Sequence, residues 1–128
     1  MARRRTATLT EAELRLMDIL WQCHQATVAE ITAALPPPPI AYNSVLTTMR
    51  ILERKGYVEH AEAGRAFVYR PLLAREDAAQ KAVGHLLSRF FDNNAGTLAL
   101  RLIEAERPSG DELSRLKALI EQYEEDEA

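Results

Sequence analysis

A stripe of polar side chains in the first half of the chain has the residue types that DNA-binding helices use. Asparagine can bond the edge of adenine, threonine can contact the methyl group of thymine, and arginine can bond guanine or a phosphate. An ordinary solvated helix face carries Glu and Lys, whereas this stripe has no acidic residue before Glu53. The pattern therefore favours DNA recognition, and a merely solvated polar face is the alternative. The members recur at helical spacing, and they are Asn43, Thr47, Arg50 and Arg54.

Further candidates for DNA contact flank this stripe. Ser44 and Thr48 have short hydroxyl groups suited to close approach to the DNA backbone, and Tyr42 begins the same helix. Arg65 lies at a predicted hairpin turn, from which it can reach phosphates or a narrow minor groove; a solvated arginine in an ordinary turn is the alternative. The basic run Arg3–Arg5 is compatible with an arm that follows the DNA backbone or with a solubilising tail.

Two capping signatures place two helices ahead of the polar stripe. The spacing T-x-x-E begins at Thr10 and again at Thr27, which predicts a helix over about 11–23 and a short helix that ends near residue 35. The run Pro36–Pro39 must end the second helix. It is interpreted as a stiff extended connector, and a proline-rich ligand segment is the alternative.

The polar stripe belongs to a third helix, which is followed by two strands. This helix begins at Tyr42 or Asn43 and ends at Gly56, a natural C-terminal cap. The segments 57–62 and 66–70 have strand-like composition on either side of a turn. Three helices and a hairpin are the outline of a winged helix-turn-helix, whose third helix enters the major groove. The predicted buried stripe of the third helix is Val45, Met49 and Leu52.

The rest of the chain predicts three more helices, over 75–91, over 97–106 and from about residue 109 onward. This C-terminal segment is too short to bury a large hydrophobic core alone. Pairing with a second copy of the chain is therefore expected. The alternative is a monomer in which these helices fold back on the winged helix. The predicted organisation is a winged-helix DNA-binding domain over 1–73 and a helical dimerisation domain over 74–128. The expected dimerisation residues are apolar, and they are Val83, Leu86, Leu87, Phe90, Phe91, Leu98, Leu102, Leu116, Leu119 and Ile120.

Charge divides the chain in the same way. The net charge of −3 over 128 residues hides a basic half and an acidic half. Residues 1–75 carry 10 Lys and Arg against 7 Asp and Glu, a net of +3, and residues 76–128 carry 6 against 12, a net of −6. Such asymmetry indicates a division of labour, with the basic half facing a polyanion.

Other classes of protein fit less well. No Gly-rich phosphate loop and no nucleophile with a companion base at a known spacing is present, so an enzyme is not predicted. The lone cysteine, Cys23, excludes an internal disulfide and is expected in the core or at its boundary, and neither a metal nor a cofactor is predicted. The basic start without an apolar run favours a cytoplasmic location. A winged helix that binds proteins instead of DNA is the alternative function.

Several stretches together resemble the penicillinase-repressor family of winged-helix repressors, which includes BlaI, MecI and CopY. The resemblance covers nearly the whole chain. The matching residues are Leu9–Leu14 with Met17 and Leu20–Trp21, Thr27–Val28 with Glu30, Ala41–Tyr42, Val45, Thr47–Thr48, Leu52, Lys55–Gly56, Gly64–Ala66, Tyr69–Leu72, Arg89–Phe91 and Leu113 to Ile120.

The resemblance implies a homodimeric repressor that binds double-stranded operator DNA with inverted repeats. It implies control of β-lactam-resistance or related genes, with no small-molecule effector bound to the repressor. It also implies relief of repression through a membrane-bound sensor metalloprotease and cleavage in the dimerisation region, near Arg101–Leu102. The copper-sensing branch has paired cysteines near its C-terminus that this chain lacks, so direct copper sensing is not expected.

Overall fold

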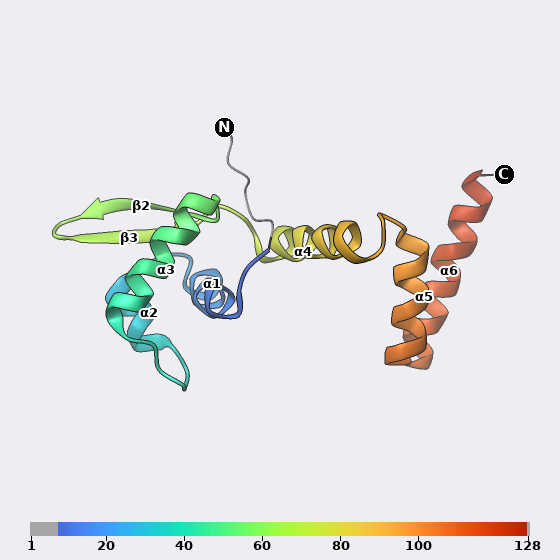
Figure 1. The fold of residues 1–128 in the computed structure, drawn as a ribbon, viewed down its shortest axis with the longest axis horizontal. Coiled ribbons are helices and arrows are strands. Elements are labelled where there is room, and N and C mark those ends of the chain that lie inside the picture. The colour runs from blue at the N-terminus through green and yellow to red at the C-terminus, as the bar shows by residue number, and fades with distance from the viewer. Residues whose placement is uncertain (1–7, 128) are drawn as a thin grey trace. The chain divides into compact units, whose positions relative to one another are not determined.

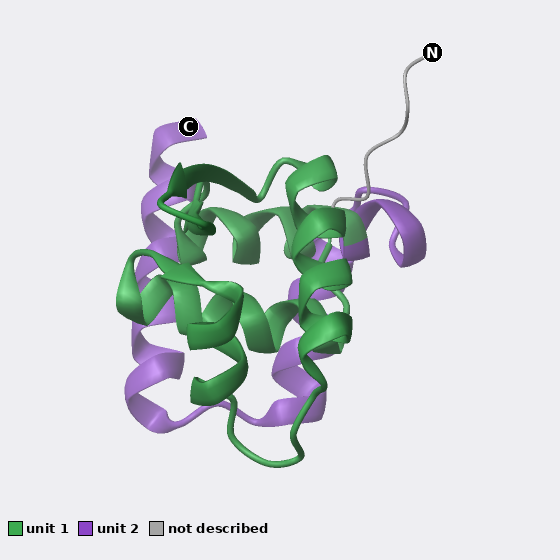
Figure 2. Cartoon of the chain, turned by 90° about the vertical axis from the view of Figure 1, so that its left-hand side faces the viewer, with its two compact units in different colours: residues 1–85 green, residues 86–128 purple. Residues whose placement is uncertain are grey.

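The computed structural model describes residues 8–127, so the predicted Arg3–Arg5 arm lies outside the described residues. The chain divides into two compact units, Met1–His85 and Leu86–Ala128 (Figure 2). In the described range the structure has no helix with both the length and the apolar character needed to span a membrane.

The first unit contains the predicted helices and hairpin. The two helices that carry capping signatures begin directly after Thr10 and Thr27, as predicted, and Gly56 ends the third helix in the left-handed conformation at φ 88°. The elements of this unit, before the helix that begins at residue 75, are α1 (Glu11–Cys23), β1 (Ala26–Thr27), α2 (Val28–Ala34), α3 (Tyr42–Lys55), β2 (Val58–Ala63) and β3 (Ala66–Pro71) (Figure 1).

A third short strand extends the predicted hairpin. Strand β1 pairs antiparallel with β3, with Ala26 opposite Tyr69, and the sheet order is β1-β3-β2. Two residues carry too little pattern to reveal a strand in the sequence. The winged helix-turn-helix is confirmed, with a three-stranded sheet in place of a simple hairpin.

The core of this unit lies between the three helices and the sheet. The predicted stripe of α3, formed by Val45, Met49 and Leu52, is fully buried. It packs with the apolar face of α1 and with Tyr57 and Tyr69 from the sheet end. Helix α3 therefore turns one face inward and leaves the opposite face free.

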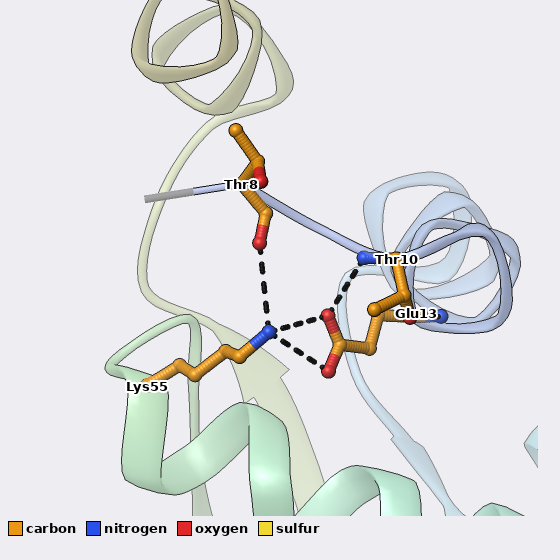
Figure 3. A network of polar contacts seen from close by, with 4 residues as sticks. All are labelled: Thr8, Thr10, Glu13 and Lys55. Atoms are coloured by element: carbon orange, nitrogen blue, oxygen red, sulfur yellow. Dashed lines mark hydrogen bonds and ion pairs between the residues drawn. The ribbon is translucent and has the colours of Figure 1, made fainter. Parts of the chain in front are cut away.

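A buried ion pair joins α1 to α3 (Figure 3). Lys55 Nζ lies 2.7 Å from Glu13 Oε1 and 3.0 Å from Oε2, and it also approaches the carbonyl oxygen of Thr8 at 3.5 Å. The same carboxylate accepts from the backbone N–H of Thr10, which completes the predicted capping box. The N-terminus of α1 is thereby tied to the C-terminal end of the helix that carries the polar stripe.

Helices make up the rest of the chain. Its elements are α4 (Arg75–Phe90), which contains the boundary between the units, α5 (Ala95–Glu106) and α6 (Gly110–Glu127). Asn94 caps α5, which therefore begins two residues earlier than predicted. A capping box of Ser109 and Glu112 begins α6. Helix α6 continues through the acidic residues at its end.

Candidate nucleic-acid interface

The outward face of α3 carries the predicted polar stripe. All four members of the stripe have exposed side chains, whereas the stripe on the opposite face is fully buried. The position after the first member, Ser44, is exposed as well. The fold therefore presents one uninterrupted row of side chains that can bond base edges, and it consists of Asn43, Thr47, Arg50 and Arg54.

Thr48 is the least available of the predicted contact residues. Its hydroxyl donates to the carbonyl oxygen of Ser44 at 2.8 Å, and its side chain is half-buried. A phosphate oxygen only accepts hydrogen bonds, so a contact from Thr48 to a phosphate requires that internal bond to break. The hydroxyl oxygen remains able to accept from the amino group of a base.

The start of α3 is also open. Ala41 occupies the N-cap and supplies no side-chain hydrogen bond, and the first helical residue, Tyr42, keeps 50% of its surface exposed. Backbone N–H groups at an uncapped helix start attract anions such as phosphates. Tyr42 thus lies where an approaching DNA backbone can be contacted.

The hairpin places Arg65 at the tip of the wing. Strands β2 and β3 pair from Val58 and Pro71 at the base to Ala63 and Ala66 beside the turn. Gly64 adopts φ +65°, a conformation that side-chain-bearing residues rarely accept, so this glycine shapes the turn. Arg65 follows it and is exposed.

Three of the described arginines of the first unit form neither an ion pair nor a hydrogen bond within the described part of the chain. They are Arg50, Arg54 and Arg65, the arginines that the sequence singles out.

The other cationic side chains described in that unit are engaged within the protein. Arg15 bonds two carbonyl groups, Lys55 and Arg70 pair with Glu13 and Glu59, Arg75 bonds Asp18, and Lys81 lies over the ring of Tyr57. Positive charge that is free to meet a polyanion is therefore concentrated on α3 and the wing tip.

Glu53, the one acidic residue of α3, lies beside the polar stripe and is turned toward the wing. Its two carboxylate oxygens lie 2.8 and 2.9 Å from Nδ1 of His60 in β2. Burial raises the pKa of the nearby Tyr69 hydroxyl, the charge of Glu53 raises it further, and the charge of Arg50 lowers it. Sequence reasoning missed this pair, although alternation along β2 from the buried Val58 places His60 on the core face of the hairpin.

The connector before α3 is held by a residue that the sequence analysis did not select. Arg15 Nη2 lies 2.6 Å from the carbonyl oxygens of both Pro36 and Pro38. Prolines lack the N–H group needed for most loop hydrogen bonds. Arg15 of α1 therefore holds in place the proline-rich connector, which has few backbone N–H groups of its own to form hydrogen bonds.

The residues predicted for dimerisation are largely uncovered in the single chain. Six have exposed side chains, namely Val83, Leu86, Phe90, Leu102, Leu119 and Ile120. Three are half-buried, namely Leu87, Phe91 and Leu116, and Leu98 is buried.

Helices α5 and α6 border a groove of about 840 Å³, whose lining includes Leu102, Ile103, Leu116 and Leu119. The predicted cleavage pair, Arg101 and Leu102, lies inside α5 with both side chains exposed, and the guanidinium of Arg101 lies over the ring of Phe91.

Residues 8–127 contain no cluster of three or more His, Cys, Asp and Glu side chains placed to hold a metal ion. Cys23 is exposed, contrary to the expectation of a core or boundary position, because it lies at the end of α1, where residues 22–24 lie outside the core.

Comparison with known proteins agrees with this arrangement. The model of the penicillinase repressor family matches residues 9–122. The penicillinase repressor of Bacillus licheniformis is 26% identical over 116 residues, which cover 90% of this chain and 91% of that protein. The methicillin resistance regulatory protein MecI of Staphylococcus aureus (strain N315) is 21% identical over 117 residues, which cover 91% of this chain and 95% of that protein.

Among solved structures, the DNA-binding domain of the repressor BlaI superimposes with a TM-score of 0.51 and 25% identity, over 58% of this chain and 93% of that domain. The family match spans most of the chain, from the first turn of α1 into α6. The chain thus belongs to the penicillinase repressor family, which consists of DNA-binding transcriptional repressors and not of enzymes.

Proposed function

We propose that this repressor binds an inverted-repeat operator by inserting α3 into the major groove while the wing tip contacts the DNA backbone. The observation that carries the proposal is the free positive charge of Arg50, Arg54 and Arg65, since the other cations described in the first unit are engaged within the protein. Asn43 and Thr47 supply further base contacts from the same face, with Tyr42, Ser44 and Thr48 at its margin.

Base contacts and phosphate contacts make different contributions in this arrangement. Each well-formed contact between a side chain and a base edge discriminates by about 1–3 kcal/mol. The contact from the wing tip depends on charge alone, so it strengthens binding to any sequence and weakens as salt rises. Operator selectivity is thus assigned to α3, and part of the general affinity is assigned to the wing.

The proposed active species is a homodimer formed through the C-terminal helices. Phe90 is 73% exposed, Leu100 64% and Ile120 53%, which is unusual for a stable isolated unit. A two-fold dimer covers such a surface with an identical one and matches the symmetry of an inverted repeat. The acidic composition of these helices keeps this part of the molecule away from the DNA.

Relief of repression is proposed to follow cleavage in the dimerisation region. The family resemblance places the bond near Arg101–Leu102, and a membrane-bound sensor metalloprotease is the proposed trigger. Cutting α5 removes part of the surface that pairs the two copies, and two separate winged helices bind a two-half operator far more weakly than a linked pair. The names of the relatives favour β-lactam-resistance or related genes as the targets.

Selection of duplexes from a random-sequence pool, followed by fluorescence anisotropy at two salt concentrations, tests the DNA-binding proposal. The selected sequence should be an inverted repeat whose half-sites are separated by about one helical turn or a multiple of it. Affinity should fall with salt for both selected and scrambled duplexes, with selectivity retained. Binding no tighter than that to scrambled DNA would overturn the proposal and favour a winged helix that binds proteins.

A further inference from the structure

The Glu53–His60 pair joins α3 to strand β2 of the wing. Its two N–O separations are 2.8 and 2.9 Å, and each side chain keeps about a third of its surface exposed, at 33%. An ionised carboxylate only accepts hydrogen bonds, so Nδ1 of His60 must carry the donated proton. The pair is therefore directional, from the wing to the helix.

The sheet holds the His60 ring in place for this contact. His60 lies opposite Tyr69 in the register of β2 and β3. Its ring stacks on Phe67, with the centroids 4.4 Å apart and the planes at 30°, and its centroid lies 5.4 Å from that of Tyr69. Two aromatic neighbours thus limit the rotation of the imidazole and direct one nitrogen toward α3.

Arg50 is the competing partner for the same carboxylate. It precedes Glu53 by three residues, and helix positions three apart are neighbours that form ion pairs. Both side chains also act on the Tyr69 hydroxyl, where the charge of Glu53 raises the pKa and that of Arg50 lowers it, so both charges lie near that hydroxyl. In the described part of the chain Glu53 pairs with His60, and Arg50 forms no ion pair.

We propose that His60 is a positioning residue for DNA recognition, because it holds the Glu53 carboxylate at the wing and so leaves Arg50 free to enter the major groove. This inference rests on the proposed function, which assigns a base contact to Arg50. Without His60, the carboxylate turns to the guanidinium three residues away and withdraws it from the DNA. The role is indirect, since neither partner of the pair needs to touch a base.

Rescue by a second substitution distinguishes this role from simple support of the wing. His60→Ala should reduce the ratio of affinities for selected and scrambled duplexes by about tenfold, within the range of one lost arginine–guanine contact. Adding Glu53→Gln removes the charge that captures Arg50, so the double variant should return to within about threefold of the unaltered protein. A purely structural defect would persist in the double variant, because the wing still lacks His60.

Glu62 supplies a matched control. It lies two residues beyond His60 on the same face of the hairpin and is exposed, so Glu62→Gln removes an equal charge without releasing Arg50. Adding Glu62→Gln to His60→Ala should leave the loss of selectivity unchanged. This control distinguishes capture of Arg50 by Glu53 from a general repulsion between a carboxylate and DNA. In the Arg50→Ala background, His60→Ala should cause no further loss of selectivity.

Anisotropy titrations of these variants, each checked by thermal unfolding, decide the inference. The inference would be overturned if His60→Ala kept the selectivity of the unaltered protein, or if Glu53→Gln failed to reverse a loss of selectivity. Either result would leave the proposed function intact. An unaltered protein that does not discriminate between the duplexes would overturn the proposed function and this inference together.

Discussion

At the scale of single residues, exposed arginines differ in whether they form an ion pair within the protein. Arg70 and Arg65 belong to the same hairpin, yet the first pairs with Glu59 and the second has no ion-pair partner among the described residues. Sequence type alone treats the two alike. The difference matters because a nearby carboxylate offsets the charge of a paired arginine and so weakens its attraction to a phosphate.

The wing and the helix should respond differently to the loss of an arginine. Arg65→Ala should weaken binding to selected and scrambled duplexes by a similar factor and reduce the slope of log affinity against log salt by about 1. Arg50→Ala should reduce the ratio between the duplexes by about tenfold, and Thr47→Ala should reduce it less. Anisotropy over a salt series measures both effects, and a selective loss in Arg65→Ala would contradict its assignment to the backbone.

Tyr69 links the stability of the winged helix to alkaline pH. Burial raises the pKa of its hydroxyl, and the charge of Glu53 adds to the effect, so folding favours the neutral phenol. The contribution to the free energy of unfolding is complete below about pH 10, the ordinary pKa of tyrosine, and is lost as the pH rises through the higher pKa of the folded state.

Urea unfolding at pH 8 and pH 11 tests that link. Tyr69→Phe should lose less stability between the two pH values than the unaltered protein does, because the substituted ring cannot ionise. Tyr123→Phe is the control, since Tyr123 is 63% exposed on α6. An equal alkaline loss with and without the Tyr69 hydroxyl would contradict the assignment.

At the scale of elements, polar contacts determine how α3 is held against its neighbours. The Glu13–Lys55 pair fixes its C-terminal end to α1, and Arg15 of α1 fixes the connector before its start. Both contacts join residues more than twenty positions apart in the chain. Helix α1 therefore serves as the support on which the DNA-binding helix is placed.

Lys55→Met should lower the free energy of unfolding of the winged helix by about 3 kcal/mol, because it leaves a buried carboxylate without its counter-charge. Glu13 is 4% exposed, so water cannot replace the lost partner. Adding Glu13→Gln should recover much of the loss. Urea denaturation measures the effect, and the neighbouring exposed Arg54→Met should change stability by no more than about 0.5 kcal/mol.

Arg15→Ala should release the proline-rich connector and weaken operator binding about threefold, as the loss of one modest hydrogen bond would. Hydrogen exchange of the amides from residue 40 to residue 44 should accelerate, because that segment joins the connector to α3. Arg15→Lys is the graded control, since an ammonium group lacks the planar geometry of the guanidinium. Unchanged exchange in Arg15→Ala would show that the connector is stiff without this contact.

At the scale of the whole molecule, the two units differ in how far each closes its own core. The first unit buries a continuous cluster from α1, α2, α3 and the sheet, whereas Leu98 is the one buried residue among the described residues of the second unit. A segment that buries so little cannot offset the entropy of ordering its helices. This imbalance is the physical argument for a second copy.

Leu102→Asp and Ile120→Asp should each convert the proposed dimer to a monomer, because they place a charge in the paired surface. In the single chain these side chains are 50% and 53% exposed, so an isolated copy tolerates the change. Sedimentation measures the mass and circular dichroism the helix content, and Lys117→Asp on the exposed face of α6 is the control. A dimer that survives both aspartates would place the interface elsewhere.

Local pattern determined most of the elements and the candidate site. Capping signatures, helical periodicity and Gly56 placed α1, α2 and α3 almost to the residue, and the opposite faces of α3 followed from spacing alone. These features depend on neighbours within one turn of helix, so the chain displays them directly. The dimer and the individual DNA contacts stay predictions.

The tertiary structure decided which of the candidate side chains are free. It added β1 to the sheet, exposed Cys23, engaged Arg15 with the proline carbonyls and turned Glu53 away from the polar stripe toward His60. Each of these outcomes depends on a partner distant in the chain or on where a helix meets its neighbours. Sequence spacing determines which residues share a face of a helix or strand. Only packing brings charged side chains of two different elements close enough to form an ion pair, because the attraction between charges falls with distance.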